Sequence, residues 1–201
     1  DFPEIEAIAG ASSRRSTIKV DGTPTFASFA LLDANFFDIF DLRFLRGNKV
    51  SALRDTSSLV LTESQAARLF GGENPIGKLV EIERDGRRLL RVSAVIADIP
   101  RDSHLNFELI ARFDSAAADP DELQSWSMLD TSIYARFRPG TDIAAVNRRM
   151  AAWERRHIGS ELDQSFDYAF APIRGVHLAP AMGDGSRPAG DRMAVKTFSA
   201  I

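Results

Sequence analysis

The chain has 201 residues, of which 44% are hydrophobic and 26% are charged, a balance typical of a globular protein with a buried core. Its formal net charge of −3 gives no support for a nucleic-acid binder, which needs a basic face. Cysteine is absent, which excludes thiolate zinc sites, disulfides and a cysteine nucleophile.

The N-terminal third predicts a pair of strands. Residues 16–20 and 26–32 have strand composition and flank the turn Asp21-Gly22-Thr23-Pro24. The polar run Ser12 to Ser16 predicts a loop in front of them. We therefore expect a hairpin that begins near residue 16.

A short helix is predicted next, with Asp33 as its N-cap. Its phenylalanines are expected in the core rather than in an exposed docking patch; they are Phe36, Phe37 and Phe40. Residues 44–48 predict a turn, and the polar residues 49–58 predict a loop.

The clearest secondary-structure signals lie between Leu59 and Pro100, where the sequence predicts a strand, a helix, a turn and a hairpin. Thr62 and Gln65 have the spacing of a capping box, and Gly71-Gly72 ends the predicted helix. Ala66, Leu69 and Phe70 fall on its apolar face, which we expect to be buried against the hairpin.

The hairpin follows the turn 74–77 and has Asp85-Gly86 at its tip. Alternation predicts that one face of its two strands points inward. The inward residues are Val80, Ile82, Leu90, Val92, Ala94 and Ile96.

The last third predicts strands at residues 107–113 and 132–137, then a helix from Asp142 to His157 with one apolar stripe. Short β runs are expected at 166–171 and 176–178, followed by a Gly, Pro and Asp-rich segment at 179–192. The absence of an initial Met predicts a fragment excised from a longer protein. The apolar end at 193–201 fits either a cut before a longer apolar segment or an ordinary C-terminal strand.

Few residues invite a chemical role. Asp98, Asp102 and His104 are close enough in sequence for a metal or acid/base site, although local turn hydrogen bonds explain them as well. Glu81 and Glu83 could form a carboxylate pair, but they are also expected on a solvated strand face. The glycines at 71, 72 and 77 lack a complete Walker A or Rossmann pattern. The sequence thus predicts no catalytic, cofactor-binding or metal-binding residues and no cofactor.

Three segments together resemble the periplasmic core domain of MacB/FtsX-type ABC transporter permeases. They are a N-F-F-x-x-F segment that ends in Gly (35–47), an A-x-x-L-F-G-x-x-x-P-[IV]-G-K segment (67–78), and a V-x-G-V-hydrophobic strand (92–96). Ala94 replaces the glycine of the last motif. The Pro100 to Phe107 element, P-x-x-S-H-L-x-F, is typical of one branch of these permeases.

The resemblance implies an α+β fold with two lobes. A porter-like β-α-β lobe would comprise residues 1–48 and 105–178, and a smaller inserted sabre lobe would comprise 49–104. Residues 179–201 would be a mobile linker to a transmembrane helix. Residue 1 and about residue 195 would then lie at the same end of the molecule.

The implied function is a non-catalytic extracytoplasmic domain at the periplasmic face of the bacterial inner membrane. It would couple ATP-driven conformational change to export or to a periplasmic partner. Implied partners are a separate ABC ATPase subunit, a second permease copy, a periplasmic adaptor or substrate protein, and the membrane through flanking helices. One alternative is a soluble metal- or acid/base-dependent hydrolase that uses Asp98, Asp102 and His104. Another is a passive scaffold that contacts only a partner protein.

Overall fold

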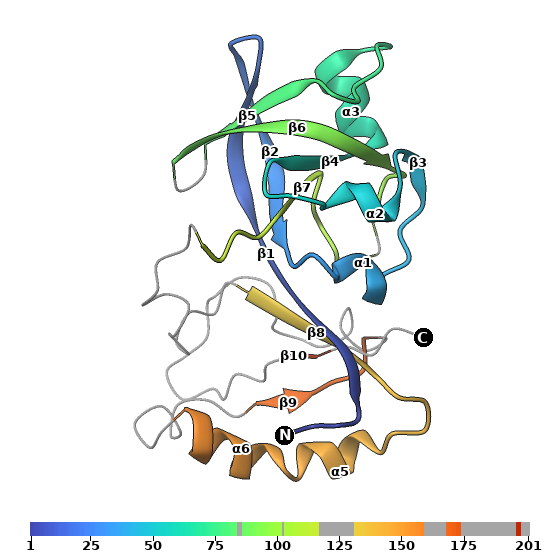
Figure 1. Cartoon of the computed structure of the whole chain (residues 1–201), viewed down its shortest axis with the longest axis vertical. Coiled ribbons are helices and arrows are strands. Elements are labelled where there is room, and N and C mark those ends of the chain that lie inside the picture. The colour runs from blue at the N-terminus through green and yellow to red at the C-terminus, as the bar shows by residue number, and fades with distance from the viewer. Residues whose placement is uncertain (84–85, 102, 117–130, 159–167, 174–195, 198–201) are drawn as a thin grey trace. The chain divides into compact units, whose positions relative to one another are not determined.

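The computed structural model describes residues 1–83, 86–101, 103–116, 131–158, 168–173 and 196–197 (Figure 1). The chain forms two compact units: unit 1 comprises Asp1–Gly10 and Asp119–Ile201, and unit 2 comprises Ala11–Ala118. Strand β1 (Ile5–Val20) contributes residues to both. Mixed sheet and helix confirm the α+β class, while the predicted lobe boundaries at residues 49 and 104 stay a prediction.

Unit 2 is built on a ring of six paired strands. In ring order these are β1, β2 (Thr23–Leu32), β7 (Leu109–Arg112), β4 (Ser58–Thr62), β6 (Arg87–Ile96) and β5 (Leu79–Glu83), and β5 pairs back with β1. The β2–β7 and β4–β6 pairs are parallel, whereas the other four are antiparallel. Strand β3 (Phe44–Arg46) pairs with β6 off the ring.

The core of unit 2 is made by the inward face of these strands. Period-two alternation places every second side chain inside, and the core cluster contains four of the six residues predicted to point inward from β5 and β6: Val80, Ile82, Leu90 and Val92. Partners from β1, β2, β4 and β7 complete the cluster: Ile18, Ala27, Phe29, Leu59, Leu61, Leu109 and Ala111. The predicted hairpin face is therefore confirmed as far as Val92. Beyond it the register between β4 and β6 shifts, so that Val95 enters the cluster, and the prediction that Ala94 and Ile96 share this face is wrong.

The predicted loop at Ser12 to Ser16 is wrong, because these residues lie within β1 and pair with residues 27–31 of β2. Their polarity reflects solvent exposure, since Ser13, Arg14 and Arg15 are exposed. The turn of the hairpin is confirmed: Asp21 (φ 48°) and Gly22 (φ 79°) occupy the left-handed region, as a two-residue type I′ turn requires.

Helix α1 (Phe36–Ile39) is capped at Asn35, so the prediction of Asp33 as N-cap is wrong; Asp33 instead accepts the Phe36 N–H through its carbonyl. Phe36 and Phe37 are buried and Phe40 is half-buried, which confirms the core interpretation. The Phe36 ring stacks on Phe40 at 4.6 Å and meets Phe107 edge-on at 6.1 Å.

The segments predicted as a turn and a loop contain β3 and helix α2 (Lys49–Ala52), respectively. The Asn48 side chain caps α2 by accepting the Ser51 N–H at 3.0 Å. Between them, Gly47 has φ +71°, and a Cβ there would lie 2.6 Å from the Ser93 carbonyl oxygen. Only glycine allows this close approach of the chain to β6.

Helix α3 (Glu63–Phe70) starts at Thr62 and stops at Gly71 (φ 60°), as predicted. The predicted capping box is wrong, because the Thr62 side chain makes no cap hydrogen bond and Gln65 is buried. Asp98, two residues beyond the end of β6, accepts the Ser64 N–H at 2.9 Å and the Ser64 hydroxyl. A carboxylate distant in sequence thus replaces the local cap.

The apolar face of α3 is only partly as predicted. Ala66 is 9% exposed, whereas Leu69 and Phe70 are half-buried and pack against the rim of the core cluster. The Lys78 ammonium lies 5.0 Å from the centre of the Phe70 ring. One side of the Phe70 ring therefore faces a cation and not the core. Removing the ring would leave a smaller cavity, so Phe70→Ala should destabilise the fold less than truncation of a fully buried phenylalanine.

Unit 1 contains β8 (Thr131–Phe137), which lies beside β1 in the sheet, and the short parallel pair β9 (Ala169–Phe170) and β10 (Lys196–Thr197). The predicted helix to His157 is divided into α5 (Ile143–Asn147) and α6 (Met150–His157). Asp142 caps α5, as predicted, by accepting the Ala145 N–H at 3.1 Å.

The described core of unit 1 is rich in aromatic residues. Its buried members are Ala135, Phe137, Val146, Met150 and Phe170, with Phe2, Ile5, Ile143, Trp153 and Tyr168 packed around them. The apolar stripe predicted for the helix faces this cluster. The predicted strand at 176–178, the segment 179–192 and residue 195 lie outside the described residues, so the expected proximity of the chain ends stays a prediction.

Candidate functional site

The predicted candidates Asp98, Asp102 and His104 do not assemble into a described site. Both carboxylate oxygens of Asp98 are used as the cap of α3. The His104 ring lies 6.0 Å from the Phe40 ring, beside the aromatic cluster of α1. Asp102 lies outside the described residues. Asp98 therefore serves the fold of unit 2.

The strand carboxylates Glu81 and Glu83 share one face of β5, as predicted, and both are ion-paired. Lys19 of β1 lies 3.6 Å from Glu81 and also pairs with Glu83. Arg87 pairs with Glu81 as well. Hydrogen bonding to Glu83 raises the pKa of Lys19, and the charges of both glutamates add to this. The face is a cross-strand charge network.

The spacing Gly72 to Gly77-Lys78 matches a phosphate loop up to its lysine, but Leu79 stands where Ser or Thr is required. Strand β5, rather than a helix, follows it. Lys78 pairs with Glu73, which lowers the pKa of that glutamate. The loop therefore lacks the helix N-terminus that holds a nucleotide phosphate.

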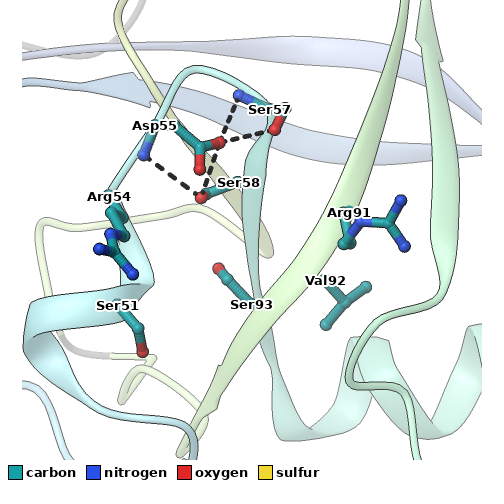
Figure 2. Close-up of a pocket in the computed structure, with 8 residues that line it drawn as sticks. All are labelled: Ser51, Arg54, Asp55, Ser57, Ser58, Arg91, Val92 and Ser93. Atoms are coloured by element: carbon teal, nitrogen blue, oxygen red, sulfur yellow. Dashed lines mark hydrogen bonds between the residues drawn. The ribbon is translucent and has the colours of Figure 1, made fainter.

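A cleft of about 240 Å³ opens in unit 2 between the α2–β4 connection and β6 (Figure 2). Its lining is polar apart from Val92, with two arginines, one acid and four serines: Ser51, Arg54, Asp55, Ser57, Ser58, Arg91, Val92 and Ser93. In Figure 2 the side chains of Ser58 and Ser93 stand between those of Arg54 and Arg91.

Asp55 organises the connection that forms one wall of the cleft. Its Oδ1 accepts the Ser57 N–H at 3.0 Å and the hydroxyls of Ser57 and Ser58 at 2.6 and 3.2 Å. The Ser57 hydroxyl bond, above all, holds the pKa of Asp55 below its usual value. This Asx-type turn fixes where the serine oxygens point.

Arginines from three elements surround the same connection. Arg88 of β6 donates to the Thr56 carbonyl at 2.8 Å, and Arg112 of β7 donates to the Arg54 carbonyl at 3.0 Å. Arg91 donates to the Gly77 carbonyl at 2.9 Å. Arg54 is exposed. Over the described ranges, none of these four guanidinium groups contacts a carboxylate.

Sequence reasoning missed this cleft because residues 49–58 were interpreted as an unstructured loop. One signal was available: Asp55-Thr56-Ser57-Ser58 places a carboxylate two and three residues before hydroxyls, which is typical of an Asx turn. The opposite wall, from Arg91 to Ser93, could not be assigned to the same cleft without the β4–β6 pairing.

Two features are absent from the described part of the chain. Within it, no three His, Asp or Glu side chains gather as metal ligands would. Nor does that part contain a helix with the length and apolar character of a membrane span.

Several solved structures resemble the chain. A domain assigned to a permease protein of Porphyromonas gingivalis has TM-score 0.66 and 22% identity, over 78% of this chain and 66% of that one. The periplasmic region of MacB from Actinobacillus actinomycetemcomitans has TM-score 0.57 and 18% identity, over 77% and 69%. The extracellular domain of the ABC-type transporter YknZ from Gram-positive bacteria has TM-score 0.56 and 13% identity, over 79% of each.

These likenesses show that the chain shares the fold of these domains. The family of MacB-like periplasmic core domains matches residues 1–153, about three quarters of the chain. The chain therefore belongs to the MacB-like periplasmic core domains of ABC-type permeases. No curated protein matches the sequence.

Proposed function

We propose that this chain is the periplasmic part of an ABC permease subunit that performs no chemistry of its own. It would transmit the conformational change driven by ATP hydrolysis in a separate subunit to an exported substrate or to a periplasmic partner protein. The family match over residues 1–153 carries this proposal. The parent protein would lie in the bacterial inner membrane, with flanking transmembrane helices and a second permease copy beside it.

The construction of unit 2 supports a role in transmitting motion. Its strand ring closes on itself, and its core side chains are almost fully buried. Closely packed interiors transmit strain instead of absorbing it. A displacement applied to one strand would therefore move unit 2 as a body.

The test uses the full-length permease reconstituted with its ATPase. The chain has no cysteine, so single cysteines can carry spin labels. Val50 and Leu89 of unit 2 are 85% and 59% exposed and accept labels without disturbing the core. During ATP turnover, the distance between Val50 labels on two copies should change, while the distance from Val50 to Leu89 within one copy should not.

A hydrolysis-deficient ATPase variant is the matched control and should abolish the change between copies. The proposal fails if substrate is moved while no distance between copies changes. It also fails if the internal Val50–Leu89 distance changes as much, because unit 2 would then deform. The isolated chain should show no ATP turnover above buffer.

A further inference from the structure

Residues 1–4, the N-terminal segment, are held on helix α6 of unit 1 by polar side chains. The Arg149 guanidinium donates to Oε1 of Glu4 at 2.6 Å. At the other end of the segment, Nε2 of His157 lies 2.7 Å from Oδ2 of Asp1, and the Arg156 guanidinium lies 3.7 Å from the same oxygen. Arg149 is the N-cap residue of α6 and His157 is its last residue, so the segment is attached at both ends of the helix.

Arg149 makes a second contact with the N-terminal segment. Its guanidinium lies 5.3 Å from the centre of the Phe2 ring, within the range of a cation–π interaction. Phe2 also meets Phe170 edge-on at 5.8 Å and packs around the core of unit 1. Hydrogen bonds from the Glu4 backbone N–H and then from Arg149 lower the pKa of Glu4, so its carboxylate is charged at neutral pH. One guanidinium thus binds an acid and a ring of the same segment.

These side-chain contacts decide how the N-terminal segment responds to a pull on residue 1. The Glu4 carbonyl accepts the Arg138 N–H just beyond the end of β8, and Ile5 then begins β1. Chain ends that are held only by exposed backbone hydrogen bonds fray at almost no cost in free energy, because the bonds open one after another. Contacts at both ends of α6 are instead loaded together. The segment can therefore stay on unit 1 under load.

We infer that Arg149 is a positioning residue that fastens the N-terminal segment to α6 and makes unit 1 follow a displacement of residue 1. The inference rests on the proposed function, in which a transmembrane helix precedes residue 1 and moves during ATP hydrolysis. Isolated exposed ion pairs contribute little. Arg149 contributes more than such a pair, because it contacts a half-buried acid and a half-buried ring, Glu4 and Phe2, at the same time.

Amide hydrogen exchange of the 201-residue chain tests the attachment. Arg149→Gln should speed exchange of residues 2–8 roughly five- to thirtyfold, because the ion pair and the cation–π contact are lost together. Arg149→Lys keeps a cation for both contacts and should exchange much like the wild type. Arg155→Gln, on the exposed surface of α6, removes one charge from the same helix and is the matched control. Trp153 fluorescence verifies that unit 1 is folded in each variant.

The reconstituted full-length permease tests the consequence for unit 1. A spin label at Ala151, an exposed position of α6, reports the motion of unit 1 as a distance between two copies. During ATP turnover this distance should change in the wild type and in Arg149→Lys, and change less in Arg149→Gln at an equal rate of ATP hydrolysis.

The inference is overturned if Arg149→Gln leaves either the exchange of residues 2–8 or the Ala151 distance change as in the wild type. It is also overturned if Arg155→Gln alters them as much as Arg149→Gln does. The failure of the proposed function has a different signature, since the distance between Val50 labels would then stay constant in the wild type. The exchange measurement decides the attachment in either case.

Discussion

The two units reach stability by different means. Unit 2 is held by main-chain ladders that close a ring around thirteen buried residues. The described part of unit 1 has five buried residues in its cluster, and side chains there do what strands do in unit 2. Asn147 accepts the Phe170 N–H at 2.8 Å and donates to the Phe170 carbonyl at 2.9 Å. Its amide thus takes the place of a neighbouring strand for β9.

A second side chain does similar work in unit 1. Glu154 is 5% exposed and accepts the Tyr168 N–H at 2.7 Å. Because a buried backbone N–H without a partner costs about 1–3 kcal/mol, each of these anchors matters to the short segment around β9. In unit 2, many backbone hydrogen bonds between paired strands contribute to stability. In the described part of unit 1, single side chains such as Asn147 and Glu154 carry a larger share.

Intrinsic probes allow the units to be followed separately. Both tryptophans, Trp126 and Trp153, and both tyrosines, Tyr134 and Tyr168, fall in unit 1. Tryptophan fluorescence therefore reports unfolding of unit 1, while circular dichroism reports both units.

The largest expected effect is in the ring. Phe29→Ala removes an aromatic side chain that is 1% exposed in the core of unit 2. It should lower the free energy of unfolding by about 3–5 kcal/mol, measured by circular dichroism in urea. Phe26→Ala, at a position 62% exposed, is the matched control and should change it by less than about 0.5 kcal/mol. An equal shift of the tryptophan transition in Phe29→Ala would break the comparison, because both units would then unfold together.

A somewhat smaller loss is expected at Gly47. Gly47→Ala places a Cβ against the Ser93 carbonyl at positive φ, which should cost about 2 kcal/mol through backbone strain alone. Gly72→Ala is the control, since nothing lies within 4 Å of a Cβ at that position. Equal melting temperatures for the two variants would mean that β3 does not approach β6 this closely.

Asn147→Ala tests whether a single side chain stabilises unit 1. It leaves the buried backbone groups of Phe170 without their partners and should cost about 1–3 kcal/mol. The tryptophan transition in urea should shift. Asn147→Asp keeps the acceptor and loses the donor, so it should fall between the wild type and Asn147→Ala at pH 7. If Asn147→Ala did not shift the tryptophan transition in urea, the Asn147 amide would not stabilise β9 through its bonds to the Phe170 backbone.

The smallest effect concerns the tyrosines. Burial raises the pKa of Tyr134 and of Tyr168, and the charge of Glu154 raises the Tyr168 pKa further. A raised pKa favours the neutral phenol in the folded state, so stability present below pH 10 is lost as pH rises beyond it. Phenolate absorbance should appear at higher pH in the folded chain than in urea. Glu154→Gln should bring the Tyr168 pKa closer to its usual value.

Features fixed by neighbouring residues could be predicted from the sequence. The β5–β6 hairpin, the Asp142 cap and the Gly71 helix end each depend on a few adjacent positions. The cap supplied by Asp98 could not be predicted, since its partner Ser64 is 34 residues away. The parallel β4–β6 pairing was missed for the same reason, and with it the cleft. The polarity of Ser12 to Ser16 led to the wrong prediction of a loop, because solvent-exposed strands and loops have similar compositions.

The nesting of the units has a consequence for how the chain folds. Unit 2 is complete once residue 118 has been made, whereas the first ten residues belong to unit 1 and cannot find β8 until residues 131–137 follow. Domains generally fold as units during synthesis, in order from the N-terminus. Unit 2 should therefore fold first, while residues 1–10 remain unpaired until β8 has been synthesised. Ring closure between β1 and β5 also requires contacts between residues far apart in the chain, which slows folding. A chain at this stage would therefore contain a folded ring and an N-terminal segment that has not yet paired with β8.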